Sequence, residues 1–347
     1  MEIEKEQAGE AIKEATTAET PVAEEVVEEA AEEVAPEVTG EVVEEVAEEV
    51  VKKKKPGKKK KFWLTILIIF LISLPGYYCG LTVRNYEIKD ARIQGKMRIA
   101  LVTDLHSCKY GKGQKTLLDA IDQQKPDVIL LGGDIFDDQL SNVRTEEFLA
   151  GISGRYPCYY VTGNHECWAG TAAYLVQMEI LEKYGIIRLT GELVELEFGD
   201  AKILLGGVDD PQIELVNALD EDGSKLSHSK EMKQLKKSLA KKRKKAEEGA
   251  DPYAVLLSHR PDLVGEYGES GFDLILAGHA HGGQIRIPGL VNGLFVPDQG
   301  LFPKYAGGRY DLDQMTMIIS RGLARESTLF PRFCNPPELV IIDLCGE

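Results

Sequence analysis

Short apolar runs recur along the chain from residue 98 onward, and each is bounded by polar or turn-forming residues. Continuous apolar runs of this kind are typical of strands buried on both faces. Helix-like stretches at 114–124 and 172–184 separate several of them. The runs are RIALVTD (98–104), DVILLGGD (127–134), CYYVTGN (158–164), AKILLGG (201–207), YAVLLSH (253–259), DLILAGH (273–279), MTMIISRG (315–322) and ELVIIDL (338–344). The pattern predicts an α/β domain of roughly 250 residues.

The N-terminal 50 residues follow a different pattern and contain no aromatic residue. They carry 18 Asp or Glu against two Lys, a net charge of −16, so they cannot bury enough apolar surface to fold alone. The repeated segments VVEEAAEEV (26–34) and VVEEVAEEV (42–50) place valines on one helical face, but Pro36 and Gly40 interrupt the pattern. Residues 1–51 are therefore predicted to be a disordered acidic tail, with a helix formed on a partner as the alternative.

A block of eight lysines, KKKKPGKKKK (52–61), precedes an uncharged stretch, FWLTILIIFLISLPGYYCGLTV (62–83). A helix over that stretch is long enough for a bilayer core, and its terminal aromatic residues suit the two interfaces. We expect one transmembrane helix; Pro75-Gly76 leaves a signal anchor or a signal peptide as alternatives, although no cleavage site stands out. The lysines predict a cytoplasmic N terminus, with the bulk of the chain on the other side of the membrane. A nuclear-localisation signal is a weaker interpretation of the lysines beside the adjoining apolar stretch.

The charge of the remaining chain bears on its partners. Without the tail and the lysine block, residues 62–347 carry a net charge of −8, which argues against a nucleic-acid partner held by general charge. The six cysteines include no C-x-x-C pair, so disulfides and free buried thiols both stay open.

A charged insert at 211–250 contains a predicted amphipathic helix at 230–248. Met232, Leu235 and Leu239 fall on one helical face beneath a dense basic face. The first interpretation is a solvated charged face over the domain, and the second is contact with an anionic membrane surface.

Polar side chains follow the apolar runs where those runs end, and five of the six histidines are among them. In α/β domains, ligands gather at the carboxyl ends of the strands. Imidazole together with carboxylate or carboxamide oxygen is the ligand set of Zn, Mn or Fe, and an acid shared by two metals makes a dinuclear site. The residues are Asp104, His106, Asp134, Asn164, His165, His259, His279 and His281.

In order and spacing these residues resemble the motifs of the calcineurin-like metallophosphoesterases. The motifs are D-x-H (104–106), G-D (133–134), G-N-H-E (163–166), H (259) and G-H-x-H (278–281). The segments GHAHGGQIRIP, QGLFPKYAGG and PPELVIIDL further resemble the membrane-anchored bacterial branch of YkuE-like and YaeI-like phosphodiesterases. The resemblance covers about residues 96–347. It implies, for a domain at 84–347, a four-layer sandwich of two mixed β-sheets flanked by helices; the acidic tail and the charged insert depart from the family.

The resemblance also implies roles for individual residues. One of two divalent metal ions (Mn, Fe or Zn) would be held by Asp104, His106, Asp134 and His281, and the other by Asp134, Asn164, His259 and His279. The nucleophile would be a metal-bound hydroxide. His165 would stabilise the transition state or protonate the leaving oxygen, with a purely structural histidine as the alternative. Candidate phosphate contacts are Arg260 and Arg321, and candidates for orienting the ligands are Glu166 and Asp137.

The expected function is that of a membrane-anchored dinuclear-metal phosphoesterase, foremost a phosphodiesterase that hydrolyses a lipid-linked or envelope phosphoester. A phosphomonoesterase or a nuclease on the same scaffold is the alternative enzyme. The non-enzymatic alternative is a surface or scaffold protein, with the acidic tail binding a cytoplasmic partner.

Overall fold

The computed structural model describes residues 80–219, 223–246, 251–325 and 331–346, together with Phe62, Trp63, Thr65 and Tyr77. The predicted acidic tail and lysine block, and most of the predicted transmembrane stretch 62–83, lie outside the described residues. No helix within the described ranges combines the length and the apolar character needed to cross a membrane.

The C-terminal boundary predicted for the transmembrane stretch is wrong. Thr82 and Val83 begin strand β1, where they pair with Glu338 and Leu339 of another strand. Val83 is partly buried and packs against a hydrophobic cluster of the domain. The partner strand satisfies the backbone of these two residues, which a local apolar pattern does not reveal.

Six strands form the first sheet, in the order β1-β14-β2-β3-β4-β5. β14 runs parallel to β1 and antiparallel to β2, while β2 to β5 are parallel to one another. The strands are β1 (Thr82–Lys89), β2 (Lys96–Val102), β3 (Val128–Gly132), β4 (Cys158–Val161), β5 (Ile187–Arg188) and β14 (Glu338–Cys345).

The second sheet also has six strands, in the order β12-β13-β9-β8-β7-β6. Its central strands are parallel and its two edge strands are antiparallel to their neighbours. The strands are β6 (Leu193–Phe198), β7 (Ala201–Gly207), β8 (Ala254–Leu257), β9 (Leu274–Ala277), β12 (Gly308–Asp311) and β13 (Thr316–Ile319). A short separate hairpin consists of β10 (Phe295–Val296) and β11 (Gly300–Leu301).

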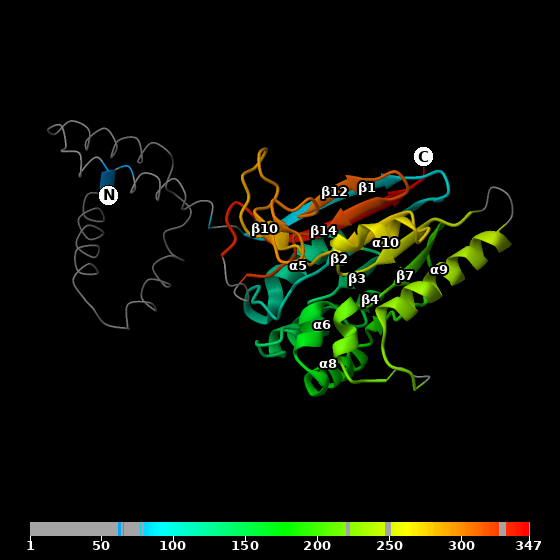
Figure 1. Ribbon diagram of the computed structural model, residues 1–347, viewed down its shortest axis with the longest axis horizontal. Helices are drawn as coiled ribbons and strands as arrows, with labels where there is room; N and C mark the ends of the chain where they lie inside the picture. The colour runs from blue at the N-terminus through cyan, green and yellow to red at the C-terminus, as the bar shows by residue number, and fades with distance from the viewer. Residues whose placement is uncertain are drawn as a thin grey trace. The chain divides into compact units, whose positions relative to one another are not determined.

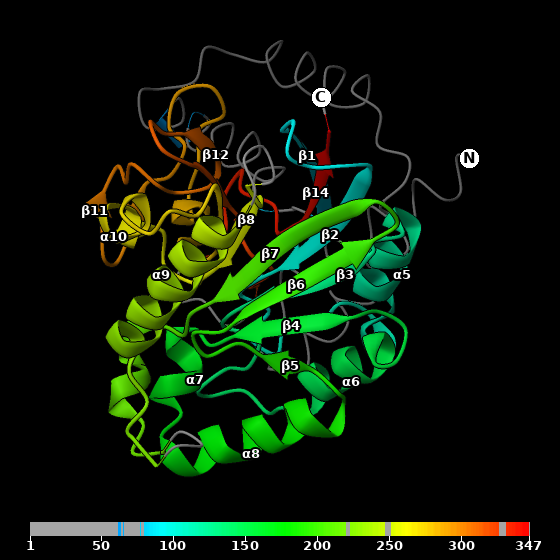
Figure 2. The same cartoon turned by 90° about the vertical axis from the view of Figure 1, so that its right-hand side faces the viewer.

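The two sheets face each other, and helices cover their outer faces (Figures 1 and 2). Side chains of both sheets, such as Leu101 and Leu257, form the cluster between them. A second cluster joins the first sheet to α5, α6 and α8, and a third joins the second sheet to α9 and α10. The helices are α5 (Lys115–Gln124), α6 (Val143–Ile152), α7 (Asn164–Trp168), α8 (Thr171–Lys183), α9 (His228–Lys245) and α10 (Val264–Gly268). The predicted mixed α/β fold, with two sheets flanked by helices, is confirmed.

The amphipathic helix predicted at 230–248 corresponds to α9. Its stripe of Met232, Leu235 and Leu239 is fully buried in the third cluster, against the outer face of the second sheet. Burial of this stripe attaches the charged insert to the domain.

The described cysteines are not paired with one another. Cys108, Cys158 and Cys167 are buried thiols, and Cys334 and Cys345 are partly buried. Burial raises the pKa of the Cys158 thiol to about 12, so this residue behaves as a small apolar side chain.

Candidate metal centre

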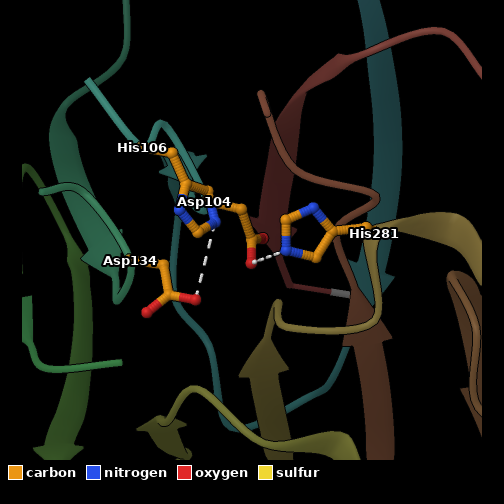
Figure 3. A group of neighbouring side chains, drawn as sticks. All are labelled: Asp104, His106, Asp134 and His281. Atoms are coloured by element: carbon orange, nitrogen blue, oxygen red, sulfur yellow. Dashed lines mark ion pairs between the residues drawn. The ribbon is translucent and has the colours of Figure 1, made fainter. Parts of the chain in front are cut away.

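The polar side chains that follow β2, β3, β8 and β9 converge at the carboxyl ends of these strands, between the two sheets. Two groups of ligand atoms that share Asp134 form there, and within each group all atoms lie within 4.8 Å of one another; a third such group, of His106, Asp137 and His165, lies beside them. Figure 3 shows the first group, in which the carboxylates of Asp104 and Asp134 lie beside two imidazoles. Asp134 belongs to both groups. The groups are Asp104, His106, Asp134 and His281, and Asp134, His259 and His279.

The backbone at this place is strained. Asp104, His106, Asp134, His279 and His281 all have positive φ, at 53°, 48°, 51°, 65° and 47°. For a non-glycine residue this conformation costs about 1–3 kcal/mol and persists only where the surrounding fold enforces it. The strain turns these side chains away from the strand direction and toward one another.

Hydrogen bonds on the outer side of the rings orient two of the imidazoles. The Nδ1 atom of His106 lies 3.0 Å from Asp137 Oδ2, and Nδ1–H of His259 donates to the carbonyl of Gly132 at 2.8 Å. When one ring nitrogen carries the proton for such a bond, the other presents a lone pair. The Nε2 atoms of both rings are thus the ones available to a metal.

Asp298 has the same role for His279. Its Oδ2 atom lies 2.7 Å from His279 Nε2 and also accepts a hydrogen bond from Arg260 Nη1 at 2.5 Å. The guanidinium of Arg260 is held in addition by Asp210 through Nε at 2.7 Å. His279 therefore offers Nδ1 to the metal site, and Asp298 is fixed by a buried arginine.

Buried polar atoms without a partner test whether the site fits two metal ions. Within the described part of the chain, Asp104 Oδ2, His106 Nε2, Asp134 Oδ2, Asn164 Oδ1 and His281 Nδ1 are buried and make no hydrogen bond, although Asp134 Oδ2 lies 3.6 Å from His106 Nε2 and 3.1 Å from His259 Nε2. Leaving such an atom unsatisfied costs about 1–3 kcal/mol. Oxygen and imidazole donors pointing at a common space are suited to divalent Zn, Mn or Fe. The residues present fit a dinuclear centre.

The charges of the site act strongly on one another. Burial opposes ionisation of Asp134, but the charges of His259 and His106 outweigh it and hold the Asp134 pKa well below its usual value. Burial likewise opposes a charged His259, yet Asp134 and Asp104 raise the pKa of that ring to about 10. Burial and the neighbouring His106 lower the pKa of His281. The two carboxylates therefore favour positive charge in the space that they border.

Glu166 organises the loop that carries Asp134. This fully buried carboxylate accepts hydrogen bonds from the backbone N–H groups of Asp134 (2.9 Å), Ile135 (2.8 Å), Phe136 (3.0 Å) and Gly163 (2.8 Å). Its atoms bind backbone and not a ligand side chain. The predicted role of Glu166 in orienting the ligands is thus carried out through the backbone.

A cavity of about 370 Å³ opens over the two groups. His165 lines it, is 21% exposed, and has its Nδ1 atom 2.6 Å from Asp138 Oδ1. Arg260 also lines the cavity, whereas Arg321 is not among its lining residues. The Arg321 guanidinium instead contacts Glu338 at 3.2 Å and other groups away from the cavity.

The structure thus brings six of the seven predicted ligands into the two groups, and the seventh, Asn164, lines the same cavity, as does His165. Two contributors were not predicted: Asp138, which contacts His165, and Asp298, which contacts His279. The run Asp137-Asp138 shortly after Asp134 offered a signal for the first. Asp298 lies in the turn of the β10–β11 hairpin, whose two-residue strands follow none of the long apolar runs, and offered none.

Comparisons with known proteins agree with this geometry. Residues 97–283 match the family of calcineurin-like phosphoesterases. An uncharacterised metallophosphoesterase of Aquifex aeolicus is 28% identical, over 80% of this chain and 99% of the relative. Phosphodiesterase YaeI of Escherichia coli is 29% identical, over 78% and 89%, and the uncharacterised metallophosphoesterase YkuE of Bacillus subtilis is 26% identical, over 71% and 78%. The chain belongs to the calcineurin-like phosphoesterase family and is a metal-dependent phosphoester hydrolase.

Proposed function

We propose that the protein is a membrane-anchored phosphodiesterase that hydrolyses a lipid-linked or envelope phosphoester. The observation that carries the proposal is the set of buried, unpartnered oxygen and nitrogen atoms converging beneath a cavity. Two divalent ions held there by the seven predicted ligands would lower the pKa of a water molecule and offset the charge of phosphoryl oxygens. The similarity to a relative named as a phosphodiesterase supports the reaction class.

His165 is proposed as the proton donor to the leaving oxygen. Its Nδ1 atom is held by Asp138, so Nε2 is the ring atom left for substrate. The ring lies beside His106, with centroids 4.3 Å apart, and lines the cavity. It is absent from the two groups that share Asp134 and belongs to the third group, with His106 and Asp137. A proton held on Nε2 can therefore pass to an alkoxide oxygen that departs from phosphorus.

The charges around the cavity favour a diester over a monoester. A monoester dianion carries one more negative charge than a diester and needs more cationic partners. Among the described residues that line the cavity, Arg260 is the cationic side chain apart from histidines, and its charge is already met by Asp210 and Asp298, so the two proposed metal ions would supply most of the positive charge. The same shortage of free cations disfavours a nucleic-acid backbone.

The proposed location rests on the sequence. The apolar stretch from residue 62 to the start of β1 at Thr82 would anchor the chain, and the lysines at 52–61 would keep the N terminus in the cytoplasm. The catalytic domain would then face the lipids and polymers outside the bacterial membrane. Protease added to intact cells would remove the domain in this orientation and leave it intact in the reverse one.

The test of the reaction uses the full chain, reconstituted with Mn²⁺. Hydrolysis of a chromogenic phosphodiester is compared with that of the matching monoester and of single-stranded DNA. Asp134→Asn should abolish diester turnover without unfolding the domain, and Asp313→Asn, at an exposed acid outside the cavity, serves as the matched control. Turnover retained in Asp134→Asn would contradict the assigned site, and faster cleavage of DNA would replace the proposed substrate class.

A further inference from the structure

The segment 285–302 carries an exposed apolar surface beside the cavity. Ile287, Leu290, Leu301 and Phe302, here called the apolar tip, are 50%, 79%, 67% and 67% exposed. Large apolar side chains exposed together mark interaction surfaces more often than chance does. They belong to two successive turns, one closed by the bridge between Ile287 and Val291 and the other by the β10–β11 hairpin. Figure 1 shows β10 and its neighbouring loops at one end of the domain.

The same segment forms part of the cavity wall. Phe295, Pro297 and Asp298 line the cavity, and Asp298 positions His279. A surface that receives the apolar tip therefore also lies at the opening of the reaction site.

The course of the chain indicates which surface this is. Tyr77, near the end of the apolar stretch 62–83, packs edge-on against Phe333 with ring centroids 4.9 Å apart. The backbone of Phe333 in turn pairs with the start of the segment, donating to Gln284 at 3.1 Å and accepting from Arg286 at 2.9 Å. Tyr77, within the stretch predicted to cross the membrane, thus packs against a residue whose backbone pairs with the chain at the start of the segment that carries the apolar tip.

The charge of the segment fits the same surface. Asp298 is the single carboxylate between residues 284 and 304, and it is paired with Arg260 and His279. Lys304 is exposed, two residues after Phe302. Apolar side chains next to a cation, without a free carboxylate, suit the interface of a bilayer. By contrast, the basic C-terminal end of α9 lies at the other end of the domain in Figure 1.

We propose that the apolar tip inserts into the interfacial layer of the phospholipid bilayer that holds the chain's own apolar stretch before β1. The cavity then opens at the level of the headgroups, and a phosphodiester headgroup in the same leaflet enters it. This inference rests on the proposed membrane-anchored phosphodiesterase and names the surface through which that enzyme meets a lipid substrate.

The experiment measures the depth of the tip in a bilayer by tryptophan quenching. The chain has two tryptophans, and Trp63→Phe in the full chain leaves Trp168. In that background Leu290→Trp reports the tip, and Leu175→Trp, on the exposed face of α8, is the matched control; both positions are exposed, at 79% and 49%. Each protein is placed in phosphatidylcholine nanodiscs with or without bromine on the acyl carbons near the headgroup.

Insertion of the tip predicts that bromine quenches the added fluorescence of Leu290→Trp about twofold or more beyond that of Leu175→Trp. Equal quenching would overturn the proposal. Emission of Leu290→Trp that shifts to the blue without quenching would overturn it in favour of cover by a second copy. A full chain that does not enter nanodiscs would refute the anchor and the tip together.

Turnover of a soluble chromogenic phosphodiester by the same samples separates the two proposals. Turnover with equal quenching would refute the apolar tip and leave the proposed phosphodiesterase standing. Strong quenching of Leu290→Trp without turnover of the soluble phosphodiester would refute the proposed phosphodiesterase and the entry of a phosphodiester headgroup. The contact between the apolar tip and the membrane would then stand.

Discussion

Gly163→Ala would test how closely the backbone must approach Asp134. Gly163 has φ −106° and ψ −171°, a conformation open to any residue, so alanine adds no backbone strain there. A Cβ atom at this position would lie 2.2 Å from Asp134 Oδ1, 2.5 Å from its backbone nitrogen and 2.7 Å from its Cγ. Rotation of the carboxylate alone cannot relieve these contacts, because the backbone nitrogen is held by Glu166.

The size of the effect follows from these distances. Real Cβ atoms essentially never come closer than 3.0 Å to such atoms, so the Oδ1 contact at 2.2 Å must lengthen by at least 0.8 Å. A misplacement of about 1 Å in a reacting group can reduce the rate about 100-fold. Overpacking of this kind also costs about 1–3 kcal/mol of stability. We expect kcat/KM for the chromogenic phosphodiester to fall about 100-fold while the domain remains folded.

The assay compares full-length Gly163→Ala with Gly265→Ala, measuring turnover, bound metal by mass spectrometry and thermal unfolding. Nothing lies within 4 Å of a Cβ at Gly265, in α10, so this control should keep wild-type turnover. Turnover of Gly163→Ala within about threefold of wild type would refute the reasoning, because the position of Asp134 would then not govern the rate.

Three further substitutions have defined outcomes. His165→Ala should lower kcat about 10²–10⁴-fold with unchanged bound metal, and Asp138→Asn should lower it less; metal loss in His165→Ala would make that residue a ligand. Asp298→Asn should weaken retention of the metal about 10–100-fold in a chelator competition, and unchanged retention would show that His279 is oriented without it. Leu235→Ala should cost about 2–5 kcal/mol in urea unfolding, beside the exposed control Lys237→Ala, and no cost would mean that the apolar stripe of α9 does not stabilise the domain.

The central strands and the residues that follow them could be predicted from sequence because both signals are local. A continuous apolar run predicts a buried strand. A carboxylate or imidazole directly after such a run, as at Asp104 and His259, indicates a binding site, because ligands gather at the carboxyl ends of strands. All eight runs contain strands of the two sheets. β1 could not be found in this way, since its residues 82–89 acquire their conformation by pairing with β14, more than 200 positions later.

The residues that orient the site were harder to predict because their partners are distant in sequence. Asp298 lies in a turn whose local signals indicate only a loop, yet it contacts His279 and Arg260, 19 and 38 positions away. Arg321 was predicted as a phosphate contact because it follows a strand, as the ligands do. Glu338 pairs with its guanidinium, and Arg321 does not line the cavity. The end of a strand thus predicts the position of a residue in the fold. Whether its side chain reaches the cavity depends on the oppositely charged groups around it.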